Sequence, residues 1–340
     1  MEESRRELAR MRESKAAWQE LEHHCAKGSD DLDYDVNEVH RAKVLWALQY
    51  DRRPEDLPLL RFLAEQEALC RRHAPFQGLG DQAELAGFLL ALHRQVEDVW
   101  RQFAIKRANF DTFCGYDSEY VFAAGVHATL ELVRGGDHPL RGELLEYFGE
   151  TDLDDDDVEE WARRKQEWFP ADEADEDALT WVERAKLAGE HELARRELDR
   201  WAEDRPRDAG TLSQLRYELA DLGAFAEAAR AQRDALEFAE TDWARASGWQ
   251  SLAELERKAG EHGKAWQALR ECRKALENED GWQELGMGRD LVHELYLLAG
   301  QAEPALARDV LDEAERQARE VPGLPPVVER AASAARERLR

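Results

Sequence analysis

The sequence predicts an all-α protein: a helical bundle, then a right-handed α-solenoid of about four helix–turn–helix units. Three observations lead to this prediction. Apolar residues recur at helical spacing along most of the 340-residue chain. No stretch keeps for long the period-two alternation of a half-buried strand. A short glycine-containing step returns four times in the second half. A chain of this length can bury a large core, either as two domains or as one repeat array.

Helices are expected in succession through the first half. A first helix carries its apolar side from Leu8 to Cys25. The strongest signal is the stripe from Leu85 to Phe103, which keeps i, i+3/i+4 spacing and predicts one long helix. Proline and paired glycines supply breaks at Pro54, at Gly135-Gly136 and at Pro170. The helices expected after the first cover residues 37–50, 54–73, 81–108, 118–133 and 158–168.

The cysteines and the N-terminal segment predict a cytoplasmic protein. Four cysteines at positions 25, 70, 114 and 272 have neither zinc-ligand spacing nor the pattern of a disulfide framework. The opening residues, MEESRRELARMRESK, are charged throughout, and apolar runs such as FLLAL are far too short to span a bilayer. We therefore expect neither a signal peptide nor a membrane segment.

Acidic residues dominate the composition. Against 47 basic residues there are 74 acidic ones, which leaves a net charge of −27. Such a chain repels phosphate backbones and anionic lipids, so direct nucleic-acid or membrane binding is not expected. The charge is explained either by a solvated helical surface or by attraction to a basic partner.

No metal site or cofactor is expected. The runs at Asp31–Asn37 and Asp152–Asp156 have the alternate oxygen ligands of a calcium loop. They lack its glycine at position six and its glutamate at position twelve. His23 and His24 lack i, i+4 ligand spacing and are expected half-exposed on the first helix.

The repeated step marks a series of helical hairpins. It reads GEHELA at Gly189, GAFAEA at Gly223, GEHGKA at Gly260 and GQAEPA at Gly300, at spacings of 34, 37 and 40 residues. Each glycine is expected to end one helix in a left-handed conformation. Alanine follows five residues later in all four, as Ala194, Ala228, Ala265 and Ala305, and would let the next helix pack closely.

These residues resemble the tetratricopeptide repeats (TPRs), whose hairpins carry glycine, an aromatic residue or histidine, and a small residue at the turn. The resemblance covers about residues 177–320, that is, four units. Spacings of 37 and 40 residues exceed the family's 34, and Ala302 replaces the aromatic in the fourth unit. The expected domains are residues 1–170, a helical domain of unassigned family; 171–322, the TPR-like repeats; and 323–340, a capping helix.

The resemblance implies a concave groove lined by the first helix of each hairpin. Its positions translate to a polar, slightly acidic face made of Glu183, Lys186, Ser213, Tyr217, Gln250, Glu254, Arg257, Asp290 and Glu294. The lysine and asparagine clamp with which some family members hold a C-terminal carboxylate is missing. The resemblance therefore favours a basic or neutral protein or peptide as the partner.

One segment of the first half is a candidate for chemistry. Asn109–Tyr120 crowds aromatic, acidic and thiol groups between two expected helices. A ligand site or a nucleophile, base and orienter would draw on Asp111, Cys114, Asp117 and His127. A helix end followed by a helix start explains the same string without chemistry.

Two classes of function follow from the sequence. The first is a non-enzymatic adaptor or regulatory subunit that presents an acidic repeat groove to a partner, or an inhibitor of a basic partner. The second is an enzyme or small-ligand sensor that uses Asn109–Tyr120, with the repeats as a docking arm.

Overall fold

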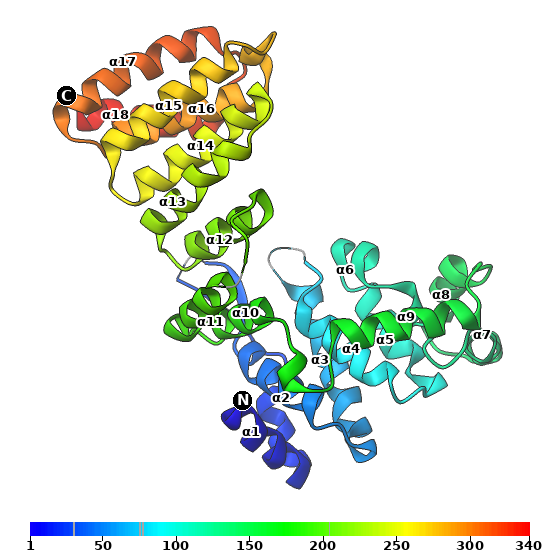
Figure 1. Cartoon of the computed structure of the whole chain (residues 1–340). Helices are drawn as coiled ribbons and strands as arrows, with labels where there is room; N and C mark the ends of the chain where they lie inside the picture. The colour runs from blue at the N-terminus through cyan, green and yellow to red at the C-terminus, as the bar shows by residue number, and fades with distance from the viewer. Residues whose placement is uncertain (30, 75, 77, 204) are drawn as a thin grey trace. The chain divides into compact units, whose positions relative to one another are not determined.

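The protein is all-α, as predicted, apart from one short β-hairpin (Figure 1). The computed structural model describes residues 1–29, 31–74, 76, 78–203 and 205–340. The chain divides into two compact units, Met1–Asp177 and Ala178–Arg340. In the described part of the chain, no helix combines the length and apolar character needed to cross a membrane.

The first unit contains short helices joined by tight turns, together with the hairpin. In chain order its elements are α1 (Glu2–Glu13), η1 (Lys15–Leu21), β1 (Cys25–Lys27), β2 (Asp33–Asp35), α2 (Glu38–Tyr50), η2 (Pro54–Asp56), α3 (Leu57–His73), α4 (Asp81–Ala91), η3 (Val96–Asp98), α5 (Val99–Lys106), α6 (Phe110–Gly115), η4 (Ser118–Tyr120), α7 (Val126–Gly135), α8 (Arg141–Phe148), α9 (Asp155–Trp168) and η5 (Glu173–Asp175).

The predicted helix through Cys25 is wrong beyond α1. Ser14 has an extended backbone, and its hydroxyl accepts a hydrogen bond from the backbone of Ala16, which starts the 3₁₀-helix η1. The chain then enters the antiparallel hairpin, where Cys25 lies opposite Asp35. Leu21 is nevertheless buried. Helical spacing of apolar residues therefore located the core side but did not distinguish a 3₁₀ turn from a continuing α-helix.

The stripe from Leu85 to Phe103 spans two helices instead of one. Between α4 and α5 the backbone turns at Arg94, which has a positive φ of 49°, and Gln95 is extended. Both ends of the stripe are buried all the same. Similarly, the helix expected to begin at residue 118 begins at Val126, after Gly125 with φ 106°. The helices predicted at 37–50, 54–73 and 158–168 are confirmed as α2, as η2 with α3, and as α9.

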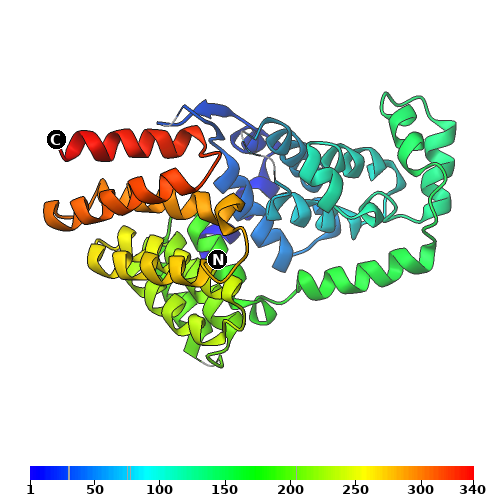
Figure 2. The ribbon, with the colours of Figure 1, turned by 90° about the horizontal axis from the view of Figure 1, so that it is seen from above.

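The second unit is a succession of helices in which consecutive helices from α10 to α17 pack against each other, whereas α18 packs against α16. Figures 1 and 2 show α14 to α18, coloured yellow-green to red, lying side by side. In chain order the elements are α10 (Ala178–Leu187), α11 (His191–Glu203), α12 (Ala209–Asp221), α13 (Phe225–Ala235), η6 (Leu236–Phe238), α14 (Asp242–Lys258), α15 (His262–Leu276), η7 (Trp282–Glu284), α16 (Gly286–Ala299), α17 (Pro304–Glu320) and α18 (Pro326–Arg338).

Three of the four glycine steps have the predicted conformation. Gly189, Gly223 and Gly260 have φ of 72°, 75° and 79°. The residue after each glycine donates its backbone N–H to a carbonyl five residues earlier, at 2.8 Å, which closes the preceding helix. Ala194, Ala228 and Ala265 are fully buried, as close packing of the second helix requires.

The fourth step differs. Gly300 has an α-helical φ of −72°, so its predicted left-handed conformation is wrong. The reason lies downstream, because Pro304 forces the residue before it out of the helix, and α17 starts four residues after the glycine. Ala305 is consequently exposed, and Ala307 takes the fully buried position.

The C-terminal helix α18 packs against α16. Its Val328, Ala332 and Ala335 are buried in the hydrophobic cluster of the second unit. Arg338 donates hydrogen bonds to the carbonyl oxygens of Ala299, at 3.1 Å, and Gln301, at 3.4 Å. The end of α16, which lacks a left-handed glycine, is thus capped by a side chain from α18.

Candidate functional site

The nine predicted groove residues all lie on the first helix of a hairpin. Glu183 and Lys186 lie on α10, Ser213 and Tyr217 on α12. The other five are Gln250, Glu254 and Arg257 on α14, and Asp290 and Glu294 on α16. Their exposure differs, because Arg257 and Glu294 are buried against each other and Lys186 is enclosed by carboxylates.

Lys186 is surrounded by acidic groups. Its ammonium lies 2.8 Å from Glu183, 3.0 Å from Glu218 and 2.5 Å from Asp221. Burial disfavours the charged lysine, but these three partners outweigh it and raise the pKa of Lys186. One cation faces three carboxylates, so this part of the face remains negative.

Arg257 and Glu294 neutralise each other. The guanidinium makes a two-pronged contact with the carboxylate, at 2.5 Å from Nε and 3.2 Å from Nη2. Both side chains are about nine-tenths buried. Arg257 therefore supplies no free positive charge to the groove and serves instead to join α14 to α16.

A hollow of about 370 Å³ lies where α14 faces α16. Three predicted groove residues, Gln250, Glu254 and Asp290, line it together with Trp243 and Met287. Trp243 is 42% exposed, and Asp290 is exposed with no ion-pair partner among the described residues. An exposed aromatic ring beside a carboxylate suits a side chain with an apolar stem and a cationic tip.

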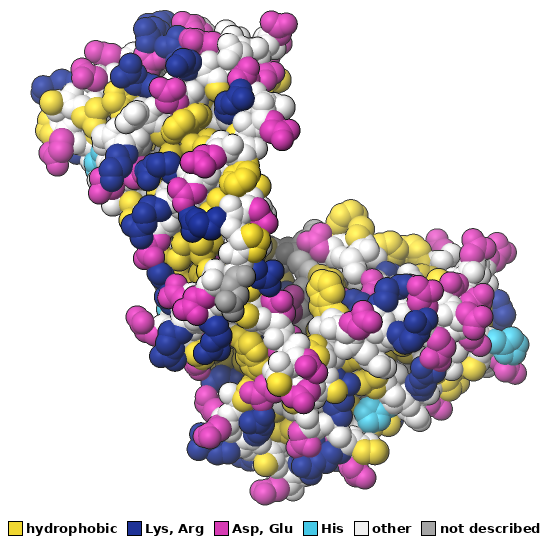
Figure 3. Space-filling view, viewed as in Figure 1, with side chains coloured by type: hydrophobic (Ala, Val, Ile, Leu, Met, Phe, Trp, Pro, Cys, Tyr) yellow, Lys and Arg dark blue, Asp and Glu magenta, His cyan; other side chains and the backbone are white. Residues whose placement is uncertain are grey.

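Charges elsewhere on the molecule are mixed. On the face shown in Figure 3, acidic and basic side chains are interspersed within each unit. Many charged side chains of the described residues form ion pairs one helical turn apart, such as Arg164 with Glu160 at 2.9 Å. Because such neighbours cancel locally, the paired side chains contribute little to the charge that a partner meets.

The four residues proposed for chemistry around Asn109–Tyr120 are not brought together. Asp111 and Cys114 are exposed on α6, and His127 is exposed at the start of α7. Asp117 accepts a hydrogen bond from the indole of Trp161 and pairs with Lys165. No hydrogen bond or ion pair joins any two of the four in the described residues.

This segment is held by Lys106 and by a helix cap. The Lys106 ammonium donates to the carbonyl oxygens of Phe113, at 3.0 Å, and Tyr116, at 2.5 Å. Asn109 caps α6 through the backbone N–H of Thr112. The crowded string is therefore a packed helix start and turn.

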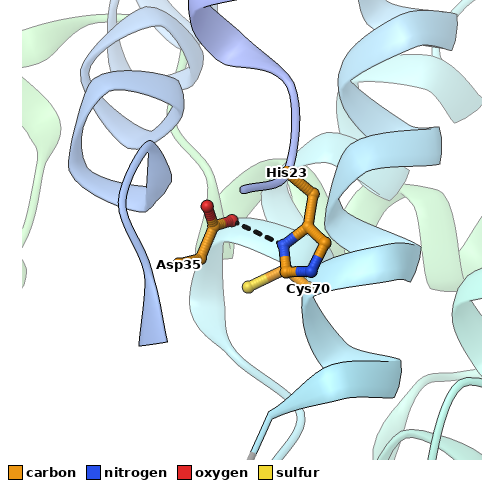
Figure 4. Close-up of side chains that lie close together, drawn as sticks. All are labelled: His23, Asp35 and Cys70. Atoms are coloured by element: carbon orange, nitrogen blue, oxygen red, sulfur yellow. Dashed lines mark hydrogen bonds and ion pairs between the residues drawn. The ribbon is translucent and has the colours of Figure 1, made fainter. Parts of the chain in front are cut away.

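A second polar cluster, which the sequence did not suggest, lies inside the first unit. Figure 4 shows His23, Asp35 and Cys70 converging from the loop before β1, from the end of β2 and from α3. One donor atom from each lies within 4.8 Å of the others. The Asp35 side chain is 2% exposed and that of His23 is 10% exposed. His23 and His24 both lie in a loop, so their predicted position on a helix is wrong; the His23 side chain is mostly buried, and His24 is exposed.

Asp35 is the best-fixed member of the cluster. Its Oδ2 lies 3.0 Å from Nδ1 of His23 and 2.6 Å from Nη2 of Arg41. Its Oδ1 accepts hydrogen bonds from the backbone N–H groups of His24 and Asn37. Burial alone would raise the pKa of Asp35, but these donors lower it to about 2, so the group is a carboxylate at neutral pH.

Charged groups around the cluster are paired. The fully buried Arg41 bridges Asp35 and Glu67, whose Oε1 lies 2.9 Å from Nε. Arg71 donates to the sulfur of Cys70 at 3.2 Å and pairs with Glu38 at 3.0 Å. Oε2 of Glu67 has no hydrogen-bond partner although it is buried.

The cluster does not have the properties of a nucleophilic site. Cys70 is 4% exposed, and burial raises the pKa of its thiol to about 11. A thiol with that pKa is protonated at neutral pH. Because the side chain is buried, a substrate cannot reach the sulfur. On the far side of the imidazole, Nε2 of His23 lies 3.1 Å from Nδ1 of His73.

Sequence spacing gave no direct sign of this cluster, because its three members lie 12 and 35 residues apart. An indirect sign exists in α2. Arg41 shares its helix face with Leu45 and Leu48, which are buried. A charged residue on an apolar stripe requires a buried partner, and that partner is Asp35 with Glu67.

Comparison of the chain with protein-family models, with curated proteins and with solved structures finds no match.

Proposed function

We propose that this chain is a non-enzymatic interaction protein, an adaptor or regulatory subunit, that binds a basic segment of a partner. In this proposal Ala178–Arg340 is a right-handed α-solenoid of four TPR-like hairpins. Its support is the recurrence of left-handed glycine turns at Gly189, Gly223 and Gly260 and the packing of consecutive helices from α10 to α17 against each other. Stacked hairpins bury faces that one hairpin leaves exposed.

The observation that carries the proposal is the hollow between α14 and α16. It holds an exposed tryptophan, Trp243, the thioether of Met287, the carboxylate of Asp290 and that of Glu254, which already pairs with Lys258. Aromatic side chains in partly enclosed sites are the usual anchors of protein interfaces. The exposed carboxylate of Asp290, which has no ion-pair partner among the described residues, makes an arginine or lysine of the partner the best-matched occupant.

The remaining groove charges support the same class of partner. Lys186 is outnumbered by its three carboxylates, and Arg257 is neutralised by Glu294. A partner that presents acidic groups would find no free cation at these positions. In the inhibitor form of the proposal, the groove covers a functional basic surface, and association slows steeply as salt rises.

An enzyme or ligand sensor using Asn109–Tyr120 is the weaker proposal. It requires Asp111, Cys114, Asp117 and His127 to act together, yet no hydrogen bond or ion pair joins any two of them in the part of the chain that the structure describes. Asp117 is already engaged by Trp161 and Lys165.

The test is selection of binding peptides from a phage-displayed random library on the immobilised full chain. We expect the selected sequences to be rich in arginine and lysine with one apolar residue. Affinities of a selected peptide are then measured by fluorescence anisotropy for the wild type, Trp243→Ala and Asp290→Lys. Both variants are expected to weaken binding, each by roughly tenfold or more, as loss of an interface anchor does.

Matched control variants make the same two kinds of substitution at exposed positions outside the groove. Trp168→Ala deletes another exposed tryptophan, and Asp309→Lys reverses another exposed aspartate. Both controls are expected to bind as the wild type does. Selection of acidic peptides, or equal losses in the groove and control variants, contradicts the proposal.

A further inference from the structure

We propose that His23, Asp35 and Cys70 form a site for one divalent transition-metal ion of the zinc class. The three side chains offer an imidazole nitrogen, a carboxylate oxygen and a sulfur within 4.8 Å of one another (Figure 4). Nitrogen, oxygen and sulfur donors in this combination are typical of zinc sites. This inference is independent of the groove and concerns only the first unit.

The donor separations match such an ion. Bond lengths of zinc to nitrogen, oxygen and sulfur imply donor separations of about 3.5 Å in a tetrahedral site. The distance of 3.0 Å between Nδ1 of His23 and Oδ2 of Asp35 lies just below that value, and the upper limit of 4.8 Å for the donor atoms lies above it. Side-chain adjustments of about an ångström therefore suffice for coordination. Three protein ligands leave a fourth position for water.

The surroundings orient the donors as an outer shell does. If Nδ1 of His23 faces the ion, Nε2 carries the hydrogen and donates it to Nδ1 of His73, 3.1 Å away. Arg41 and the two backbone N–H groups hold the carboxylate of Asp35. Arg71 directs an N–H at the sulfur of Cys70, which stabilises a thiolate.

The charges also balance. Coordination of the ion by Cys70 releases the thiol proton to water, so a thiolate and the Asp35 carboxylate together neutralise the divalent ion. Nearby, Arg41 faces Glu67 as well as Asp35, and Arg71 faces Glu38. The bound state thus leaves no uncompensated charge in the buried cluster.

Cobalt provides a direct readout, since a thiolate bound to Co²⁺ gives a charge-transfer band in the near ultraviolet. The reduced, chelator-treated full chain is titrated with Co²⁺ and then with Zn²⁺. We expect a saturable band at one equivalent that Zn²⁺ abolishes. Cys70→Ser is expected to lack the band, whereas Cys272→Ser, which alters another buried thiol, and Cys25→Ser, which alters an exposed one, are expected to keep it.

Histidine variants test the site independently of the thiol. His23→Gln is expected to lower Zn²⁺ affinity, measured by competition with a chromophoric indicator, by at least about 100-fold, and His73→Ala by about 10- to 100-fold. Circular dichroism confirms that each variant is folded. Absence of the band in the wild type overturns the proposal, as does a band that survives in folded Cys70→Ser or unchanged affinity in folded His23→Gln.

Discussion

At the level of single residues, the buried positive charges of Arg41, Lys106 and Arg257 lie beside matched acceptors. Arg257 faces the carboxylate of Glu294, and Arg41 faces Asp35 and Glu67. Lys106 instead faces two carbonyl oxygens and no carboxylate within ion-pair distance among the described residues. These two arrangements predict different responses to mutation and to pH.

Arg257→Ala is expected to lower the free energy of unfolding by about 3–5 kcal/mol, because Glu294 is left buried without its counter-ion. Chemical denaturation followed by circular dichroism measures the loss. The comparison variant is Lys258→Ala, which breaks the exposed pair with Glu254 and is expected to cost less than about 1 kcal/mol. Similar small losses in the two variants would show that the Arg257 pair is not buried in solution.

The contribution of Lys106 to stability depends on pH with the opposite sign to that of a lysine in an ion pair, whose pKa is raised. Burial lowers the pKa of Lys106 below its ordinary 10.5. Between the folded and unfolded pKa values the unfolded chain binds more protons, so stability rises with pH there. We expect the free energy of unfolding of the wild type, relative to Lys106→Met, to increase from neutral pH toward 10.5. A difference between the two proteins that stays constant with pH contradicts this expectation.

At the level of elements, four similar glycine steps produce two kinds of turn. Gly223 has φ 75°, where alanine is strained, and no neighbouring atom lies within 4 Å of an added Cβ. Gly300 has φ −72°, and an added Cβ meets only ordinary contacts at 3.4 Å. Steric room for a Cβ is therefore available at both glycines, and only the backbone conformation makes alanine unfavourable at Gly223.

Gly223→Ala is accordingly expected to destabilise the protein by about 1–2 kcal/mol. Gly300→Ala is expected to be neutral or to stabilise it by up to about 1 kcal/mol, because alanine restricts the unfolded chain. Thermal unfolding of the two variants beside the wild type makes the comparison. Equal destabilisation by both would indicate that Gly300 also adopts a left-handed conformation.

Some elements could be predicted from the sequence, and others could not. Caps and apolar stripes identified α2, α3 and α9, because these signals lie within the helices themselves. The turn at Arg94 was missed since the buried stripe continues in α5, and the turn at Gly300 was missed since Pro304 acts from outside the motif. The metal-ligand cluster depends on the hairpin meeting α2 and α3, a long-range event that no local spacing records.

At the scale of the whole molecule, the two units have separate internal packing. The hydrophobic cluster of the second unit runs from Val182 to Ala335. Neighbouring helices supply most of its contacts, as in proteins built from stacked hairpins.

We therefore expect residues 178–340, expressed alone, to be helical and to unfold cooperatively on heating. The matched shorter fragment, residues 178–276, lacks α16 to α18 and exposes Leu269 and Leu276 of α15. It is expected to melt at a lower temperature and over a wider range, as followed by circular dichroism. An unfolded 178–340 fragment would show that the second unit requires the first.

The cap that Arg338 places on α16 means that the fourth turn is completed differently from the first three. The first three hairpins are each closed by their own glycine, so each is complete before the next begins. The fourth takes its closing donor from a helix that starts 26 residues after Gly300. The fourth turn therefore depends on a helix outside the repeated motif, and loss of the Arg338 side chain would leave the end of α16 without these donors.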